Sequence, residues 1–208
     1  SCSTYSFTKD DELFTRVLED KIQFNNISKD KIKEYSRDLY LSESERYYIR
    51  DKHNEPYSYD FIITSVHYYN SKELFLKACD ILCLSLRDLK ENFKKTLMGL
   101  DSSIDIEKKN EFIYHFILHN QSDTLGNIIQ TNITKSLTEK SPIQVCGYRK
   151  IHPLEEKIKL IVSLNSKHKI ISKKEEQKVG DVISYINDSI NYLIQCYETI
   201  HDTAEKSL

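Results

Sequence analysis

The sequence contains no run of about eighteen apolar residues, the length that a helix needs to cross a bilayer, so no membrane-spanning helix is expected. Its first residues do not form a charged segment followed by an apolar segment, which is the order typical of a secretory signal peptide. It also lacks an excess of either charge, since 30 Lys and Arg stand against 32 Asp and Glu. A dedicated nucleic-acid-binding protein usually has a basic excess, so direct binding of DNA or RNA is not expected to be the main task.

The motifs of common phosphate-binding and phosphoryl-transfer sites are absent as well. There is no Gly-x-x-x-x-Gly-Lys loop and no Gly-x-Gly-x-x-Gly loop. Nucleotidyl transfer needs clustered carboxylates that hold two Mg²⁺ ions about 4 Å apart, and the sequence has no such cluster. We therefore expect no catalytic residue, no cofactor and no metal in this chain.

The cysteines are few and irregularly spaced: Cys2, Cys79, Cys83, Cys146 and Cys196. An odd number without a pattern argues against a secreted disulfide framework and favours an intracellular, reducing compartment. Cys79 and Cys83 are four residues apart on a predicted helix, so both sulfur atoms could face one way. Zinc needs four ligands and no second pair at ligand spacing exists, so we interpret both residues as small members of a core.

Three histidines could have a chemical role. His115 and His119 lie on a predicted strand, which separates them by about 13 Å, and they could share an ion only if the stretch were helical. His152 precedes Pro153, where the backbone is extended, and we interpret its ring as a packed or hydrogen-bonded group that shapes a bend. A small enzyme that uses His152 and Cys146 is an alternative, but catalysis needs a base partner that the sequence does not reveal.

The sequence does have the periodicities of an α+β protein. Apolar residues recur at helical spacing in three ranges: 72–97, 121–137 and 175–208. Two or three short helices are expected over residues 9–54. Alternating apolar residues, or dense β-branched and aromatic residues, predict strands in four ranges: 1–8, 57–69, 111–120 and 144–164. The last range is interpreted as two strands around a bend, and the small polar residues of 99–110 predict a linker.

The predicted helix over residues 121–137 has a cap, an apolar stripe and an internal glycine. Ser122 and Asp123 are typical N-caps, because their side-chain oxygens can accept hydrogen bonds from the first turn. The stripe consists of Leu125, Ile128, Ile129, Ile133 and Leu137. Glycine inside a helix costs about 1 kcal/mol relative to alanine. We therefore expect the backbone of a paired helix or of a partner subunit to approach Gly126 closely; the alternative is a tolerated glycine on the surface.

Three motifs in this part of the chain carry a family resemblance. Thr124-Leu125-Gly126-Asn127 is followed by Gly147-Tyr148 and by His152-Pro153-Leu154-Glu155, and then by an apolar strand and a long helix. This order resembles the eleventh subunit of eukaryotic RNA polymerase II and the L subunit of the archaeal polymerase, relatives of the N-terminal domain of the bacterial alpha subunit. Ser122-Asp123 stand where that family usually has Asp-His.

The first half of the chain is similar to a different subunit of the same enzymes. The matching residues are Tyr48-Ile49-Arg50-Asp51, Glu55-Pro56-Tyr57, Phe61, Ser65-Val66 and Glu73-Leu74-Phe75. They resemble the closing strand and helix of the third-largest polypeptide of RNA polymerase II, or of its archaeal counterpart. Residues 1–7 are then similar to the strand that follows the inserted domain of that polypeptide.

Together the resemblances imply two alpha-N-terminal-domain-like half-units fused in one chain. Each would have antiparallel strands packed on long amphipathic helices, and the two would form an intramolecular pseudo-dimer. Residues 1–98 would be the third-subunit-like half, 99–110 a linker and 111–208 the eleventh-subunit-like half. Such dimers pack four long helices and this chain has three, so the fourth is expected upstream of residue 1 or in another chain. The fused arrangement implies a large DNA virus as the source.

The resemblance also implies a function. The chain would be a non-catalytic assembly platform of a multisubunit DNA-directed RNA polymerase, which docks the two largest subunits and small subunits and meets DNA only indirectly. It would act in the virion or host cytoplasm if viral, and in the nucleus if cellular. The expected contact residues are Leu125, Gly126, Asn127, Tyr148, His152, Pro153 and Leu154. The alternative is a generic α+β protein–protein adaptor unrelated to transcription.

Overall fold

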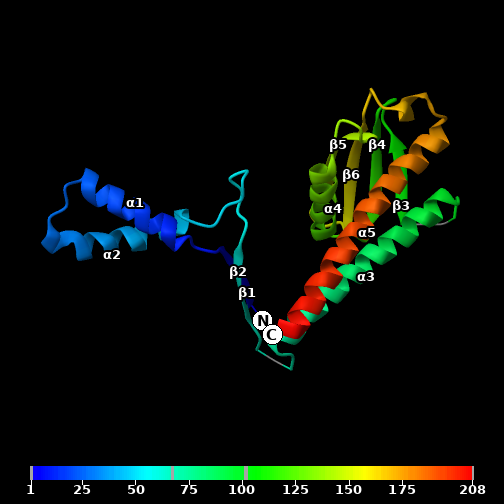
Figure 1. The fold of residues 1–208 in the computed structure, drawn as a ribbon. Coiled ribbons are helices and arrows are strands. Elements are labelled where there is room, and N and C mark those ends of the chain that lie inside the picture. Colours follow the sequence, from blue (N-terminus) through cyan, green and yellow to red (C-terminus); the bar gives the residue numbers. More distant parts are fainter. Residues whose placement is uncertain (1, 67, 101–102, 208) are drawn as a thin grey trace. The chain divides into compact units, whose positions relative to one another are not determined.

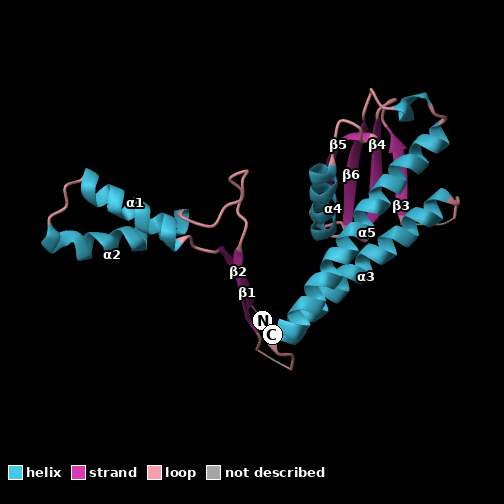
Figure 2. Ribbon diagram, in the orientation of Figure 1, coloured by secondary structure: helices cyan, strands magenta, loops and turns pink. Residues whose placement is uncertain are grey.

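The computed structural model describes residues 2–66, 68–100 and 103–207, so what we expected of Ser1, His67, Leu208 and residues 101–102 lies outside the described residues. The described residues form an α+β fold with five α-helices and two antiparallel sheets of two and four strands (Figures 1 and 2). The chain divides into two compact units, residues 1–71 and 72–208. The predicted α+β class is therefore confirmed.

The first unit contains a two-stranded ribbon and a helical hairpin. Strand β1 (Cys2–Phe7) pairs with β2 (Tyr59–Thr64) in antiparallel register. Between the two strands lie four helical elements: α1 (Asp11–Phe24), the 3₁₀ turn η1 (Lys29–Lys31), α2 (Ile32–Glu43) and the 3₁₀ turn η2 (Ser44–Arg46). Both predicted strands and the predicted short helices are confirmed within the described residues.

The core of the first unit is small. Helix α1 is capped by Asp10, whose Oδ1 accepts a hydrogen bond from the Leu13 N–H at 2.9 Å. Phe14 on α1 packs edge-on against Tyr40 on α2, with 5.5 Å between ring centroids. Among the side chains described in this unit, Leu39 is the only buried apolar one. Little apolar surface therefore holds this unit together.

The second unit is built on a four-stranded antiparallel sheet with the strand order β3-β4-β6-β5 (Figure 2). Its strands are β3 (Ile104–Lys108), β4 (Ile113–His119), β5 (Ile143–Lys150) and β6 (Lys157–Leu164). Every second residue of β4 and β6 is buried, and these form one face of the sheet: Tyr114, Phe116, Leu118, Ile158, Leu160, Val162 and Leu164. The predicted alternation in 111–120 and 157–164 is confirmed.

Three α-helices pack against that buried face: α3 (Ser71–Leu97), α4 (Asp123–Ser136) and α5 (Glu175–Ser207), with the 3₁₀ turn η3 (Lys169–Ser172) before α5 (Figure 1). Each buries one stripe, as the helical spacing predicts. Helices α3 and α5 run antiparallel along each other: the Lys72 ammonium donates to the Glu205 carbonyl near one end, and the Lys90 ammonium donates to Asn191 Oδ1 further along. All three predicted long helices are confirmed over the described residues.

The expected linker over 99–110 needs a correction, because it contains strand β3. This strand pairs with β4 from Ile104 opposite Leu118 to Lys108 opposite Tyr114, and Ile104 is buried. Its two isoleucines stand among polar residues, so the alternation is too short to stand out in the sequence.

The boundary between compact units also differs in position from the expected halves, because α3 packs with the second unit. In a pseudo-dimer, the long helix of one half is expected to pack against the other half. The packing of α3 therefore does not test the expected division at residue 98, which stays a prediction.

Candidate docking surface

The three family-like motifs meet at one end of the second unit. Thr124-Leu125-Gly126-Asn127 forms the start of α4, Gly147-Tyr148 lies in β5, and His152-Pro153-Leu154-Glu155 lies in the loop between β5 and β6. Two contacts fasten the start of α4 to this region. The Lys150 ammonium is 3.5 Å from Asp123 Oδ2, and the Gln121 N–H donates to the Glu156 carbonyl at 3.3 Å.

The predicted cap of α4 is confirmed in position but not in bonding. Ser122 is the extended N-cap residue, yet its side chain makes no capping hydrogen bond. Asp123 is the first helical residue, where a carboxylate favours the positive end of the helix dipole and pairs with Lys150. The start of α4 is therefore held by charge and by the neighbouring loop.

Gly126 is packed under an aromatic ring of the same unit. A Cβ atom at Gly126 would lie 2.7 Å from Tyr148 Cδ2 and 3.0 Å from Ile158 Cδ1. The expectation that another backbone approaches Gly126 is thus wrong, since side chains of β5 and β6 fill that space. Gly126 and the neighbouring buried Leu125 join α4 to its own sheet.

Of the other expected contact residues, Tyr148 is half-buried and the remaining four are accessible to a partner. Asn127, His152 and Pro153 are exposed, and Leu154 keeps 89% of its surface in water. A hollow of about 370 Å³ lies beside them at the start of α4, lined in part by Thr124, Lys150 and Glu156. An exposed leucine beside a polar hollow is a candidate point of contact with another protein.

The ring of His152 shapes the loop, as the sequence suggested. Its Nδ1 accepts a hydrogen bond from the Leu154 N–H at 3.2 Å, and its carbonyl accepts one from the Glu155 N–H. Cys146 is a buried residue of β5, and burial raises the pKa of its thiol to about 12. Such a thiol is protonated at neutral pH, so the structure does not favour the enzyme that pairs His152 with Cys146.

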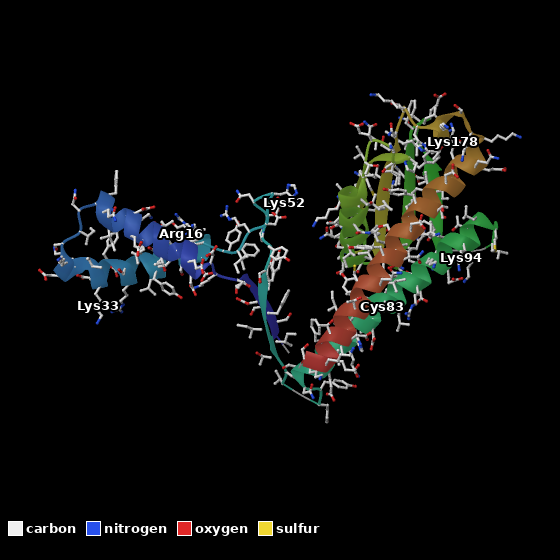
Figure 3. The ribbon with its side chains drawn as sticks, in the orientation of Figure 1. Arg16, Lys33, Lys52, Cys83, Lys94 and Lys178 are labelled. Atoms are coloured by element: carbon white, nitrogen blue, oxygen red, sulfur yellow. The ribbon has the colours of Figure 1, made fainter. Side chains whose placement is uncertain are left out.

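The two cysteines of α3 lie in the contact between α3 and α5. Cys79 and Cys83 are both buried, and Cys83 Sγ is 4.0 Å from the Ile194 carbonyl oxygen of α5. Figure 3 shows Cys83 where the two helices run side by side. Burial raises the pKa of both thiols. Packing between helices accounts for their position.

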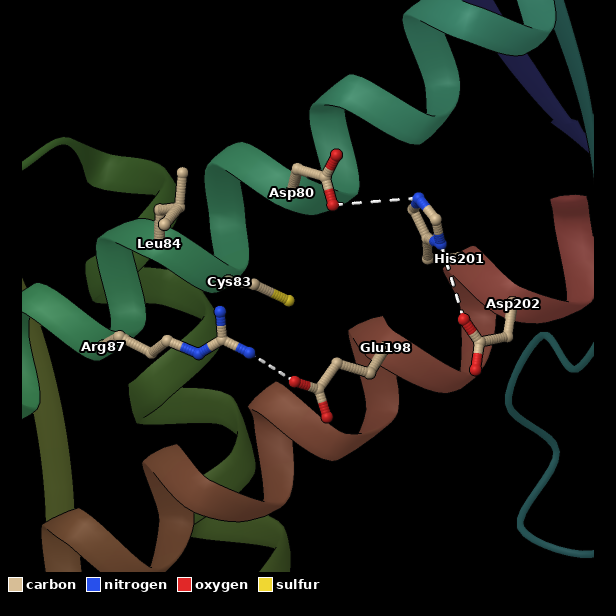
Figure 4. Close-up of a pocket in the computed structure, with 7 residues that line it drawn as sticks. All are labelled: Asp80, Cys83, Leu84, Arg87, Glu198, His201 and Asp202. Carbon is tan, nitrogen blue, oxygen red and sulfur yellow. Dashed lines mark hydrogen bonds and ion pairs between the residues drawn. The ribbon is translucent and has the colours of Figure 1, made fainter.

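Charged side chains flank this contact and were not found from the sequence. The Arg87 guanidinium lies 2.5 Å from Glu198 Oε1, and His201 Nε2 lies 3.7 Å from Asp80 Oδ1 (Figure 4). They border a hollow of about 320 Å³ between α3 and α5. An ion pair between two helices depends on how the helices are aligned along each other. The periodicity of the sequence within each helix does not reveal this alignment.

One group of metal-ligating side chain types occurs among the described residues, on the last turns of α5. The ligand atoms of His201, Asp202 and Glu205 lie within 4.8 Å of one another. Asp202 and Glu205 are exposed, and His201 contacts the carboxylates of Asp80 and Asp202. We assign this group to the pairing of α3 with α5.

Glu175 joins the start of α5 to the sheet. Its carboxylate accepts hydrogen bonds from the Lys108 ammonium at 2.5 Å and from the Tyr114 hydroxyl at 2.6 Å. Both bonds lower the pKa of Glu175, and the bond from Lys108 has the larger effect. Burial of the Tyr114 hydroxyl and its bond to the Glu175 carboxylate raise the pKa of Tyr114.

Among the described residues, no helix combines the length and the apolar character that crossing a membrane requires. Comparison with known proteins finds no matching family model and no matching curated protein.

Proposed function

We propose that this chain is a non-catalytic assembly subunit of a multisubunit DNA-directed RNA polymerase. It would combine two alpha-like halves in one chain and dock the two largest subunits, which supply the active site, together with small subunits. Contact with DNA would be indirect, and the chain would act where that polymerase transcribes: virion or host cytoplasm for a virus, nucleus for a cell.

One observation supports this proposal above the others. Three motifs that are separate in the sequence meet at one end of a sheet, and each has a structural task there. The absence of a side chain at Gly126 leaves room for the ring of Tyr148. The ring of His152 holds the loop in which Leu154 is exposed. A generic adaptor would need amphipathic helices but would have no need of these motifs together.

The repeated order of elements supports the pseudo-dimer. Two antiparallel strands followed by a long helix occur twice, as β1, β2 and α3 and again as β5, β6 and α5, although α1 and α2 are inserted between β1 and β2. The antiparallel packing of α3 on α5 suits two such halves that pair through their long helices. The main drive would be burial of apolar surface, at about 25 cal/mol per Å².

Leu154→Glu tests the docking role. Leu154 makes no core contact, so the folded state should be unchanged, whereas docking should weaken about tenfold or more because burial of a leucine contributes about 1.5–3 kcal/mol. The measurement is the amount of the two largest polymerase subunits that copurifies with the tagged chain. Phe24→Glu in the first unit is the matched control, because Phe24 is 87% exposed.

The same purification also tests the alternative function, a generic protein–protein adaptor. If the wild-type chain captures no large polymerase subunit, the polymerase proposal fails and the generic adaptor is favoured. If Phe24→Glu reduces capture as much as Leu154→Glu, the surface at Leu154 is not the docking surface.

A further inference from the structure

One end of the second unit carries a local excess of positive charge. It is formed by residues 135–142, which lead from α4 into β5, and by residues 165–178, which lead from β6 into α5; we call these two ranges the basic end. They contain seven lysines and three glutamates, a formal charge of +4 in a chain whose total is −2. Lys178, labelled in Figure 3, marks its place. The balanced total of the sequence therefore hides a basic surface.

The basic end is separate from the candidate docking surface at Leu154. Strand β5 leaves the basic end and β6 returns to it, so the loop between them lies at the other end of the same eight-residue strands. At about 3.3 Å for each residue, the two ends are about 25 Å apart. A partner bound at one end therefore need not touch the other.

The backbone of the basic end is held in place. The side-chain amide of Asn165 donates hydrogen bonds to the carbonyls of Glu139 at 3.0 Å and Ser141 at 3.1 Å, which ties the two ranges together. Its Oδ1 accepts a hydrogen bond from the Lys167 N–H at 3.1 Å. Ile170 is fully buried and fixes η3 to the core. Binding would therefore have to order only the lysine side chains, which lowers its entropic cost.

Most of the lysines at the basic end are free. Lys173 is the exception, since its ammonium is 2.6 Å from Asp181 Oδ2. Five others are exposed and have no carboxylate at ion-pair distance among the described residues: Lys135, Lys140, Lys167, Lys169 and Lys174. Gathered charges of one sign create a potential that attracts a ligand of the opposite sign.

The shape of the surface suits a polypeptide. A hollow of about 640 Å³ opens between the two ranges and is lined in part by Leu137, Gln144 and Lys167. Leu137 is half-buried there, so the hollow offers both apolar and polar contacts. It can receive a side chain of a segment that lies along the lysines.

We propose that the basic end binds an acidic segment of a partner polypeptide. Carboxylates of that segment pair with the five free lysines, and one of its side chains enters the hollow beside Leu137. This inference does not depend on the partner being a polymerase subunit.

The residues of the basic end favour a polypeptide over a nucleic acid. The two ranges contain no Arg, Phe, Tyr or Trp, whereas proteins that hold single strands stack the bases on aromatic rings. A duplex carries one charge per about 1.7 Å of its axis, so its phosphates would also face the exposed Glu139 and Glu176. A polypeptide can place uncharged residues opposite these two carboxylates.

The first test measures binding of a fluorescein-labelled peptide of ten glutamates to the full-length chain. The peptide should bind at low salt and dissociate as salt is added, because exposed charges are screened. Binding should weaken about tenfold or more in a variant that reverses three of the free lysines, since each lost pair contributes a little. The variant combines Lys140→Glu, Lys167→Glu and Lys169→Glu.

The matched control reverses three exposed lysines of the first unit, so the total charge changes equally. It combines Lys29→Glu, Lys31→Glu and Lys33→Glu, and it should bind the peptide as the wild type does. A fluorescein-labelled DNA duplex of twenty base pairs should bind more weakly than the peptide at the same salt concentration. Leu154→Glu should leave peptide binding unchanged, so this proposal and the polymerase proposal can fail independently.

A second measurement uses the full chain in the complex that copurifies with it. A carbodiimide joins a lysine amine to a carboxylate that it contacts, so Lys167 and Lys169 should be linked to acidic residues of a different polypeptide. Arginine at both positions keeps the charge, so the association should persist without these links.

Several outcomes overturn the proposal. They are no binding of the glutamate peptide, equal loss in the two triple variants, and tighter binding of the duplex than of the peptide. Carbodiimide links from the basic end that lead only to this chain, in the same copy or a second one, would overturn it as well.

Discussion

At the scale of single residues, the contact between Gly126 and Tyr148 leaves no room for a side chain. Gly126→Ala places a Cβ atom 2.7 Å from a ring carbon and 3.0 Å from Ile158. The ring cannot rotate away freely because it packs against the core. We expect a loss of about 1–3 kcal/mol in the free energy of unfolding, despite the better helix propensity of alanine, as in other overpacked cores. Urea denaturation measures it.

Gly180 provides the matched control within the same unit. It also lies in a helix, α5, but a Cβ atom there would have nothing within 4 Å. Gly180→Ala should therefore stabilise the protein by about 0.5–1 kcal/mol. In a protein that already carries Tyr148→Ala, Gly126→Ala should no longer lower the free energy of unfolding, because the ring that the new Cβ atom would meet is gone. If Gly126→Ala and Gly180→Ala had the same effect, the packing account of Gly126 would be wrong.

Glu175 makes stability depend on pH. Its folded pKa is lowered below 4.5, so its contribution is fully present above that value and is lost as the pH falls through the folded pKa. Glu175→Gln should lower the melting temperature at pH 7, and the difference from wild type should shrink toward pH 3. Thermal melts across this range measure it. If the difference in melting temperature did not change with pH, the ion pair between Glu175 and Lys108 would contribute nothing to stability.

At the scale of elements, α3 is held to the sheet by a few side chains on its inner face. Phe93 is fully buried, with its ring 6.0 Å from that of Phe116 on β4. Phe93→Ala should cost about 3–5 kcal/mol. Ile81→Ala on the same helix should cost about 0.5 kcal/mol or less, because Ile81 is exposed. Equal costs in chemical denaturation would contradict this assignment of the two faces.

At the scale of the whole molecule, the two units should differ in stability. The second has a continuous core across its sheet and three α-helices, whereas Leu39 is the only apolar side chain described as buried in the first. We expect hydrogen exchange to be slowest in β4, β6 and α5 and fast throughout residues 2–66, in the absence of a partner. Leu39→Ala should speed exchange in the first unit alone. Uniform protection of both units would contradict this view.

Much of the second unit could be predicted from sequence because its elements are long and regular. The α5 stripe repeats over many turns, and the alternation in β6 covers eight residues. Strand β3 was missed because five residues give too few repeats, and its pairing with β4 is decided by the sheet. The bend at His152 was predictable, since proline restricts the residue before it.

The candidate site could be predicted only in part. The motif residues were identified, but sequence alone did not separate Gly126, which packs inward, from Leu154, which is exposed. The Arg87–Glu198 pair has no sequence signal at all, because it joins residues more than a hundred positions apart.

The sequence by itself determined the class of fold, the long helices and most of the strands, because periodic burial and turn chemistry act over a few neighbouring residues. Only the tertiary structure decided which motif residues face the core and which remain exposed, how α3 meets α5, and that Tyr5, Tyr59 and Phe61 stay exposed. These depend on which surfaces meet after the chain has folded back on itself, and that information lies in no local pattern.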